Sequence, residues 1–234
     1  MEKKIRVAPS LLAADFLNLK KEMQRILLSK ADWVHLDIMD GHFVPNISFG
    51  LPIVSCLKSI PIFKDVHLMI ENPHQYALSF IEAGADLITF HYEAYRFKKD
   101  RLSLIKQIKN KQTFVGMSIK PNTPIDVLFP YLKQLDLVLI MSVEPGFGGQ
   151  KYLENATQKV IELRKYIDKH HLNCLIEIDG GINETTAKKA IKAGCDVLVA
   201  GSYLFDGNMK EKISQLKKKE KDAAYRSLIR PELA

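Results

Sequence analysis

Residues 33–39 read Trp-Val-His-Leu-Asp-Ile-Met, an alternation of apolar and acid–base side chains. Successive side chains of a strand point to opposite faces, so the Val, Leu and Ile of this stretch share one apolar face. His35 and Asp37 share the other face with Trp33 and Met39. A strand that packs its apolar face under helices and turns acid–base groups inward is typical of a β/α barrel, whose active site lies at the carboxyl ends of its strands.

The same unit, a short apolar run followed by a helical pattern, repeats along the whole chain. Parallel neighbouring strands need a helical crossover, so this repetition predicts a single-domain (β/α)8 TIM barrel over residues 1–234. A doubly wound open sheet usually has a glycine fingerprint after its first strand, which this sequence lacks. The expected strands are Arg6–Leu11, Trp33–Met39, Phe63–Met69, Leu87–His91, Thr113–Ile119, Leu137–Ser142, Leu175–Asp179 and Val197–Ala200. The expected helices cover residues 17–30, 50–59, 73–83, 100–110, 124–133, 153–170, 184–193 and 209–222.

Turn sequences support this division. Residues 83–86 (Ala-Gly-Ala-Asp) and 193–196 (Ala-Gly-Cys-Asp) each place a glycine at a helix end and an acid before a strand. Asn72 and Thr123 each precede a proline, which predicts a capped helix start at both places. A repeated connection is what a fold built from β/α units predicts.

The composition is that of a globular protein with a large core, because 47% of residues are hydrophobic and 26% are charged. No stretch approaches the roughly 20 apolar residues that cross a bilayer, and no secretory signal is visible, so we expect a cytoplasmic protein without a membrane partner. Cys56, Cys174 and Cys195 form no CxxC pair and are expected to be reduced thiols. Much of the net charge of +7 lies in a Lys-rich helix and tail from about residue 210, interpreted as a solvated surface.

The third and seventh expected strands repeat the alternation of the second. They turn His67 and Asp179 to the inside, where His35 and Asp37 already lie. Two imidazoles and two carboxylates suit one divalent metal cation, Zn²⁺, Fe²⁺, Mn²⁺ or Co²⁺, with coordination positions left for substrate oxygens. The alternative is a structural network in which each histidine is hydrogen-bonded to an aspartate.

Asp37 and Asp179 come from strands on roughly opposite sides of the ring. Two opposed carboxylates suit a two-base epimerisation, in which one removes a proton from carbon and the other returns one to the opposite face. A metal bound to both oxygens of the enediolate intermediate would stabilise its charge. Glu177, one layer below Asp179, and His91, at the end of the fourth strand, are expected as buried partners of the site.

Glycine turns follow the last three strands, where barrels commonly bind phosphate through backbone N–H groups. The predicted phosphate-binding residues are Gly146, Phe147, Gly148, Gly149, Gly180, Gly181, Gly201 and Ser202.

Other inward residues face the same end of the barrel. Met39, Met69 and Met141 either fill the core or pack over the substrate and exclude water. Ser10 either hydrogen-bonds a sugar hydroxyl or caps a turn.

Five longer motifs lie at residues 8–16, 35–46, 66–70, 141–150 and 177–183. They resemble the motifs of the ribulose-phosphate 3-epimerase family, and the resemblance extends over about residues 5–205. It implies interconversion of D-ribulose 5-phosphate and D-xylulose 5-phosphate in the pentose phosphate pathway, through a metal-stabilised 2,3-enediolate. Related barrels commonly self-associate, so a homo-oligomer is expected.

The resemblance also implies roles for single residues. It makes His35, Asp37, His67 and Asp179 the metal ligands, and Asp37 and Asp179 the acid–base pair. Ser10 and His67 are expected to contact a sugar-phosphate substrate, whose phosphate the glycine turns hold.

Three other functions are weighed. Allulose-6-phosphate 3-epimerase is the nearest, but its Gly-Phe-Ala-Gly and Asp-Gly-Ser differ from Gly-Phe-Gly-Gly at 146–149 and Asp-Gly-Gly at 179–181. A decarboxylase or aldolase-like synthase would need an Asp-x-Lys-x-x-Asp motif, and residues 37–40 lack the lysine. An RNA-binding protein would leave the inward acids unexplained, and no RNA-binding module is recognisable, so no nucleic-acid partner is expected.

Overall fold

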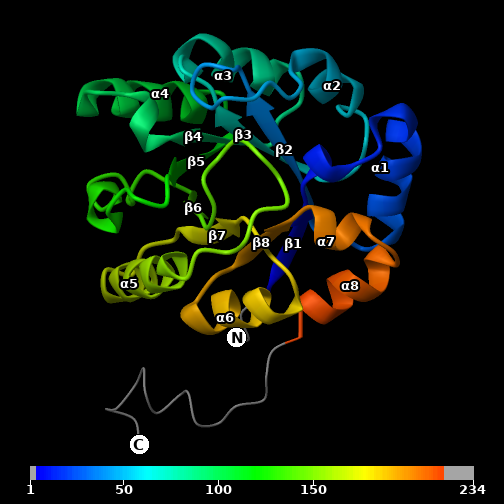
Figure 1. Ribbon diagram of the computed structural model, residues 1–234. Helices are drawn as coiled ribbons and strands as arrows, with labels where there is room; N and C mark the ends of the chain where they lie inside the picture. Colours follow the sequence, from blue (N-terminus) through cyan, green and yellow to red (C-terminus); the bar gives the residue numbers. More distant parts are fainter. Residues whose placement is uncertain (1–3, 219–234) are drawn as a thin grey trace, which may run out of the picture.

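The computed structural model describes residues 4–218, and it confirms the (β/α)8 TIM barrel (Figure 1). All strands are parallel and follow the order β1-β8-β7-β6-β5-β4-β3-β2, with the helices arranged around them. The strands are β1 Arg6–Pro9, β2 Trp33–Met39, β3 Phe63–Met69, β4 Leu87–His91, β5 Phe114–Ile119, β6 Leu137–Met141, β7 Leu175–Asp179 and β8 Val197–Ala200.

The crossovers supply the outer layer. The helices are α1 Leu19–Leu28, α2 Leu51–Cys56, α3 Pro73–Glu82, α4 Lys98–Asn110, α5 Asn155–Lys169, α6 Glu184–Ala193, α7 Ser202–Phe205 and α8 Met209–Leu216. Short 3-10 helices are η1 Leu11–Ala13, η2 Phe16–Asn18, η3 Tyr92–Ala94 and η4 Ile125–Leu128. Among residues 4–218, no helix is long and apolar enough to span a membrane.

The helix expected over 124–133 is wrong, because this crossover contains only η4 and turns. Pro130 has no N–H to donate to residue 126, so an α-helix cannot continue through it. The Phe129 amide instead donates to the Asp126 carbonyl at 3.1 Å. The expected helix start at Asn72 is confirmed, since α3 begins at Pro73, although the Asn72 side chain makes no capping bond. The expected start at Thr123 is wrong, and the Thr123 hydroxyl donates to Glu93 instead.

Other boundaries moved by a few residues. β1 ends at Pro9 because η1 begins two residues later, and α7 was not expected. The helix predicted over 209–222 is observed as α8, and residues 219–222, with the rest of the Lys-rich tail, lie outside the described residues.

The two faces of the strands divide as the alternation predicts. In β2, Val34, Leu36 and Ile38 are buried in the large core between strands and helices. Trp33, on the opposite face, belongs to a second apolar cluster that includes inward residues of other strands. The barrel interior therefore has its own apolar clusters, separate from the core between strands and helices.

An aspartate precedes every second strand and accepts a hydrogen bond from the second residue of the strand before. The four bonds run from Val7 N to Asp32 (3.0 Å), Lys64 N to Asp86 (2.8 Å), Val115 N to Asp136 (2.9 Å) and Ile176 N to Asp196 (2.8 Å). Two of these acids end the matched turns, where Gly84 (φ 112°) and Gly194 (φ 110°) adopt the left-handed conformation. The matching turns thus reflect a contact that recurs around the barrel.

β1 and β2 close the ring less tightly than the other neighbours. They share an isolated bridge between Ser10 and His35 in place of a continuous ladder. At their amino ends, the Asp32 amide donates to the Val7 carbonyl at 3.1 Å, alongside the side-chain bond described above. We call this junction the β1–β2 seam.

Candidate metal and substrate site

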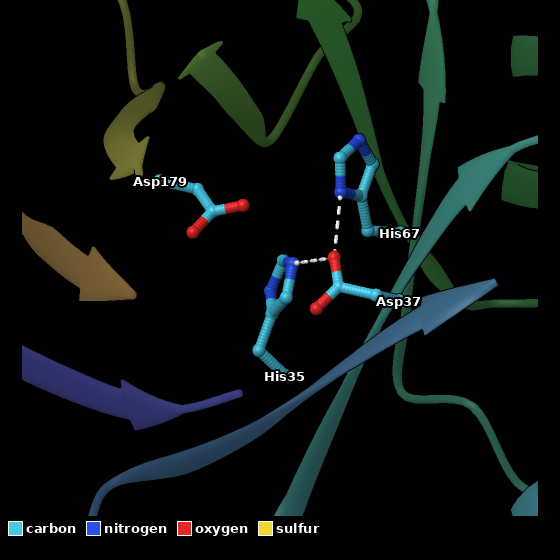
Figure 2. Close-up of side chains that lie close together, drawn as sticks. All are labelled: His35, Asp37, His67 and Asp179. Atoms are coloured by element: carbon cyan, nitrogen blue, oxygen red, sulfur yellow. Dashed lines mark hydrogen bonds and ion pairs between the residues drawn. The ribbon is translucent and has the colours of Figure 1, made fainter. Parts of the chain in front are cut away.

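Four polar side chains converge at the carboxyl ends of three strands (Figure 2). His35 and Asp37 come from β2, His67 from β3 and Asp179 from the end of β7. One nitrogen or oxygen atom of each lies within 4.8 Å of every other. The sequence prediction that these residues meet is therefore confirmed in their placement.

Asp37 lies at the centre of this cluster. Its Oδ2 accepts a 2.6 Å hydrogen bond from Ser10 Oγ across the β1–β2 seam. Its Oδ1 lies 3.2 Å from His35 Nε2 and 3.3 Å from His67 Nδ1 (Figure 2). Both imidazoles thus direct one nitrogen at a single carboxylate oxygen.

Buried partners hold the other nitrogen of each imidazole. His35 Nδ1 lies 2.5 Å from Asp65 Oδ2, and these residues are paired in the β2–β3 register. His67 Nε2 lies 2.9 Å from His91 Nε2, and His91 Nδ1 lies 3.2 Å from Glu93 Oε2. The expectation of His91 as a buried partner is borne out by these contacts.

The donor set fits a divalent metal. Among residues 4–218, His35 Nε2 is a fully buried nitrogen without a hydrogen-bond partner, although it faces Asp37. Leaving such an atom unpaired costs about 1–3 kcal/mol, and a cation between the side chains would remove that cost. Imidazole nitrogens and carboxylate oxygens are ligands that Zn²⁺, Fe²⁺, Mn²⁺ and Co²⁺ all accept, so the set does not select one of them.

The two aspartates differ electrostatically. Burial alone would raise the pKa of Asp37, but the neighbouring His35, and after it His67, hold the pKa well below its ordinary value. Burial and the nearby Asp37 carboxylate raise the pKa of Asp179 to about 7. Acids whose pKa values are pushed apart are the usual arrangement for proton transfer in two directions.

Burial shifts the pKa values of Glu177 and His91 in opposite directions. Burial, and then the Asp65 carboxylate, raise the pKa of Glu177 well above its ordinary value. Burial lowers the pKa of His91 to about 4. Burial thus favours the uncharged form of both side chains, as expected of supporting groups in the barrel interior.

A cavity of about 1170 Å³ opens above the cluster. It is lined by Asp37, Asp179 and every predicted substrate-binding residue except His67, which is fully buried. Those lining residues are Ser10, Met39, Met69, Met141, Gly146, Phe147, Gly148, Gly149, Gly180, Gly181, Gly201 and Ser202.

Glycine is required where the turn after β7 approaches Tyr152. Gly180 and Gly181 have φ angles of 119° and 60°, in the left-handed region that other residues avoid. A Cβ on Gly181 would lie 2.5 Å from the Tyr152 amide nitrogen, closer than any side chain tolerates. The turn therefore exposes backbone at the cavity wall and has no room for a side chain.

Sequence comparisons give one consistent result. The model described as the Ribulose-phosphate 3 epimerase family matches residues 6–205. The ribulose-phosphate 3-epimerase of Candida glabrata is 43% identical over 92% of this chain and 91% of its own length. That of Bacillus subtilis is 42% identical over 91% of this chain and 98% of its own.

This chain belongs to the ribulose-phosphate 3-epimerase family. Membership makes it an isomerase-type enzyme and confirms the resemblance seen in its motifs. It also disfavours the decarboxylase, synthase and RNA-binding alternatives.

The fold of this epimerase family member is shared more widely. A mutant tryptophan synthase α-subunit from Pyrococcus furiosus superposes with a TM-score of 0.67 at 16% identity, covering 92% of this chain and 99% of that one. At that identity the likeness concerns the barrel alone.

Sequence reasoning missed two residues around the epimerase site. Asp65 occupies the same inward face of β3 as His67, so the alternation could have identified it. Glu93 follows β4 in η3, and no periodic pattern indicates its contact with His91.

Proposed function

We propose that this chain interconverts D-ribulose 5-phosphate and D-xylulose 5-phosphate by proton transfer at C3. The observation that carries the proposal is the pair Asp37 and Asp179, which project from different strands into one cluster beside the large cavity (Figure 2). Relatives named ribulose-phosphate 3-epimerase, at 42–45% identity, support the choice of substrate.

The proposed binding mode uses two ends of the cavity. The glycine turns at 146–149, 180–181 and 201–202 present backbone N–H groups and a helix start, which suit a phosphate. The acid cluster lies where a sugar carbonyl and the adjacent C3 would then reach. Met39, Met69 and Met141 line the cavity between them and reduce the access of water to the reacting carbon.

In the proposed reaction, one aspartate removes the C3 proton and the other delivers a proton to the opposite face. His35, Asp37, His67 and Asp179 would together hold one divalent cation, whose charge would stabilise the negative charge that develops on the substrate. Ser10 donates to Asp37 Oδ2 and so orients this carboxylate. Asp179 faces it from β7, and its raised pKa suits an acid that both gives and takes a proton near neutral pH.

The alternative, allulose-6-phosphate 3-epimerase, is not favoured by the curated relatives, which carry the ribulose-phosphate name. Self-association, a cytoplasmic location and a single domain over residues 1–234 stay predictions from the sequence.

The test is isotope exchange in D₂O. Protein loaded with Fe²⁺, Mn²⁺, Zn²⁺ or Co²⁺ and given ribulose 5-phosphate should form xylulose 5-phosphate with deuterium at C3. Proton NMR measures the loss of the C3 proton signal. Metal in buffer without protein is the control, and chelation should stop the exchange. Unlabelled, unchanged substrate with every one of these metals contradicts the proposal, and a higher kcat/KM for allulose 6-phosphate would favour the sibling activity.

A further inference from the structure

A chain of hydrogen-bonding groups leads from the cluster toward the surface. It starts at His67, passes through His91 on β4 and ends at Glu93 in η3. Both imidazoles are fully buried, and their rings stack with centroids 5.0 Å apart. Neither His91 nor Glu93 lines the cavity, so neither is placed to touch the substrate.

The polarity of the chain follows from its outer end. A carboxylate only accepts, so Glu93 Oε2 requires the proton of His91 on Nδ1. A neutral His91 then has a lone pair on Nε2, which must accept from Nε2–H of His67 across 2.9 Å. His67 consequently has no proton on Nδ1, the atom that faces Asp37 at 3.3 Å. That free lone pair is what a metal ligand requires.

Glu93 is itself held firmly. Its Oε1 accepts from the Lys120 amide at 2.8 Å and from the Thr123 hydroxyl. The buried Arg101 guanidinium bonds the carbonyls of Tyr92, at 2.9 Å, and Tyr95, on either side of Glu93. The carboxylate therefore presents one fixed oxygen to His91.

The loop that carries Thr123 is anchored as well. Lys159 Nζ donates at 2.6 Å to the carbonyls of both Pro121 and Thr123. Thr123 is thereby kept within reach of the Glu93 carboxylate.

We propose that Glu93 is a positioning residue that acts through His91 to fix the tautomer of the metal ligand His67. Asp65 makes the equivalent contact to His35 directly, so an acid holds the outer nitrogen of His35 directly and that of His67 through His91. Such outer partners typically change metal affinity 10–100-fold. The inference rests on the proposed metal-dependent function, and the experiment below separates the two.

Glu93→Gln provides a sharp test, because it changes one oxygen into an NH₂ group. The two donors at Oε1, from Lys120 and Thr123, force the amide oxygen to that side. The NH₂ group then faces His91 Nδ1 and donates to it, which reverses the polarity of the chain. His67 becomes protonated on Nδ1 and loses its free lone pair.

The full-length protein is used in two measurements. Nitrogen-15 NMR of labelled histidines should show Nε2–H on His67 and Nδ1–H on His91 in the wild type, with both reversed in Glu93→Gln. Titration with Mn²⁺ and with Zn²⁺, by calorimetry, should show 10–100-fold weaker binding for the variant. Saturating metal should recover most of its turnover.

Glu82→Gln is the matched control, because Glu82 is an exposed acid at the end of α3, remote from the cluster, and its substitution should change neither measurement. A folded Glu93→Gln with wild-type metal affinity overturns the inference. If that variant does not fold, the wild-type spectrum decides, since Nδ1–H on His67 contradicts the proposal by itself. A wild type with the expected tautomers that binds no divalent metal refutes the proposed function and leaves the hydrogen-bond chain intact.

Discussion

Asp37 and Asp179 have unlike surroundings, although the proposed reaction uses both. Asp37 is nearly fully buried and contacts Ser10, His35 and His67. Asp179 ends β7 and is partly exposed to the cavity. One acid is therefore fixed by its partners, while the other keeps more freedom to exchange protons with a bound molecule.

If each aspartate serves one face of C3, single substitutions should separate the two half-reactions. Asp37→Asn and Asp179→Asn should each lower epimerisation by about 10³-fold, the order expected for loss of an acid–base group. Each should still exchange the C3 proton of one epimer with D₂O, and the two variants should act on opposite epimers. Exchange measured separately from both ketose phosphates, with bound metal quantified, tests this, and identical behaviour of the variants contradicts a two-base scheme.

At this scale the sequence predicted the central residues because strand alternation determines which side chains point inward. His35, Asp37, His67 and Asp179 follow from that rule alone. Their partners depend on which inward residues lie at the same level, and that is set by the β2–β3 register, which pairs His35 with Asp65. The contact of Glu93 with His91 could not be predicted, because the single turn of η3 shows no periodic pattern.

Among the elements, the recurring aspartates at the amino ends of the strands are a structural counterpart of the site. Each accepts a hydrogen bond from a backbone N–H near the start of a strand, and a buried unpaired amide would cost about 1–3 kcal/mol. Asp196 has a second role, because its Oδ2 also accepts from Arg164 at 2.5 Å. These acids act on stability and lie at the end opposite to the chemistry.

Asp196→Ala should lower the free energy of unfolding by about 3 kcal/mol, because it breaks a buried pair and strands the Ile176 amide. Asp168→Ala is the matched control, since Asp168 pairs with the same Arg164 but is 67% exposed. Its loss should cost at most about 0.5 kcal/mol. Urea unfolding of both variants measures the difference, and equal losses would show that Asp196 makes no special contribution.

Helices and strands were predictable where a periodic apolar pattern extends over many residues. They were less predictable where a single residue prevents the structure that the pattern indicates. Strand positions came within two residues because the buried runs are bounded by turn residues. The missing helix before β6 shows the limit, since Pro130 prevents a segment that otherwise has helical spacing.

For the whole molecule, the site draws on strands from both halves of the chain, yet among residues 4–218 the cavity lining ends at Asp206. The sequence predicts that the Lys-rich tail is a solvated surface, so we expect the tail to be dispensable for catalysis.

A chain ending at residue 218 should accordingly retain wild-type kcat/KM for ribulose 5-phosphate, because β8 and α8 are complete before that point. Steady-state kinetics of both chains test this, with circular dichroism to compare folding. A change in sedimentation without a change in kcat/KM fits the expectation, whereas loss of activity from a folded truncated chain contradicts it.

The β1–β2 seam has a consequence for heat tolerance. Regions with few backbone bonds between neighbours open at lower free energy than continuous ladders, so the ring should part first beside Ser10. Opening there withdraws the hydroxyl from Asp37 while the other strand pairs stay closed. Warming would then inactivate the enzyme reversibly at a temperature below the one at which the barrel unfolds.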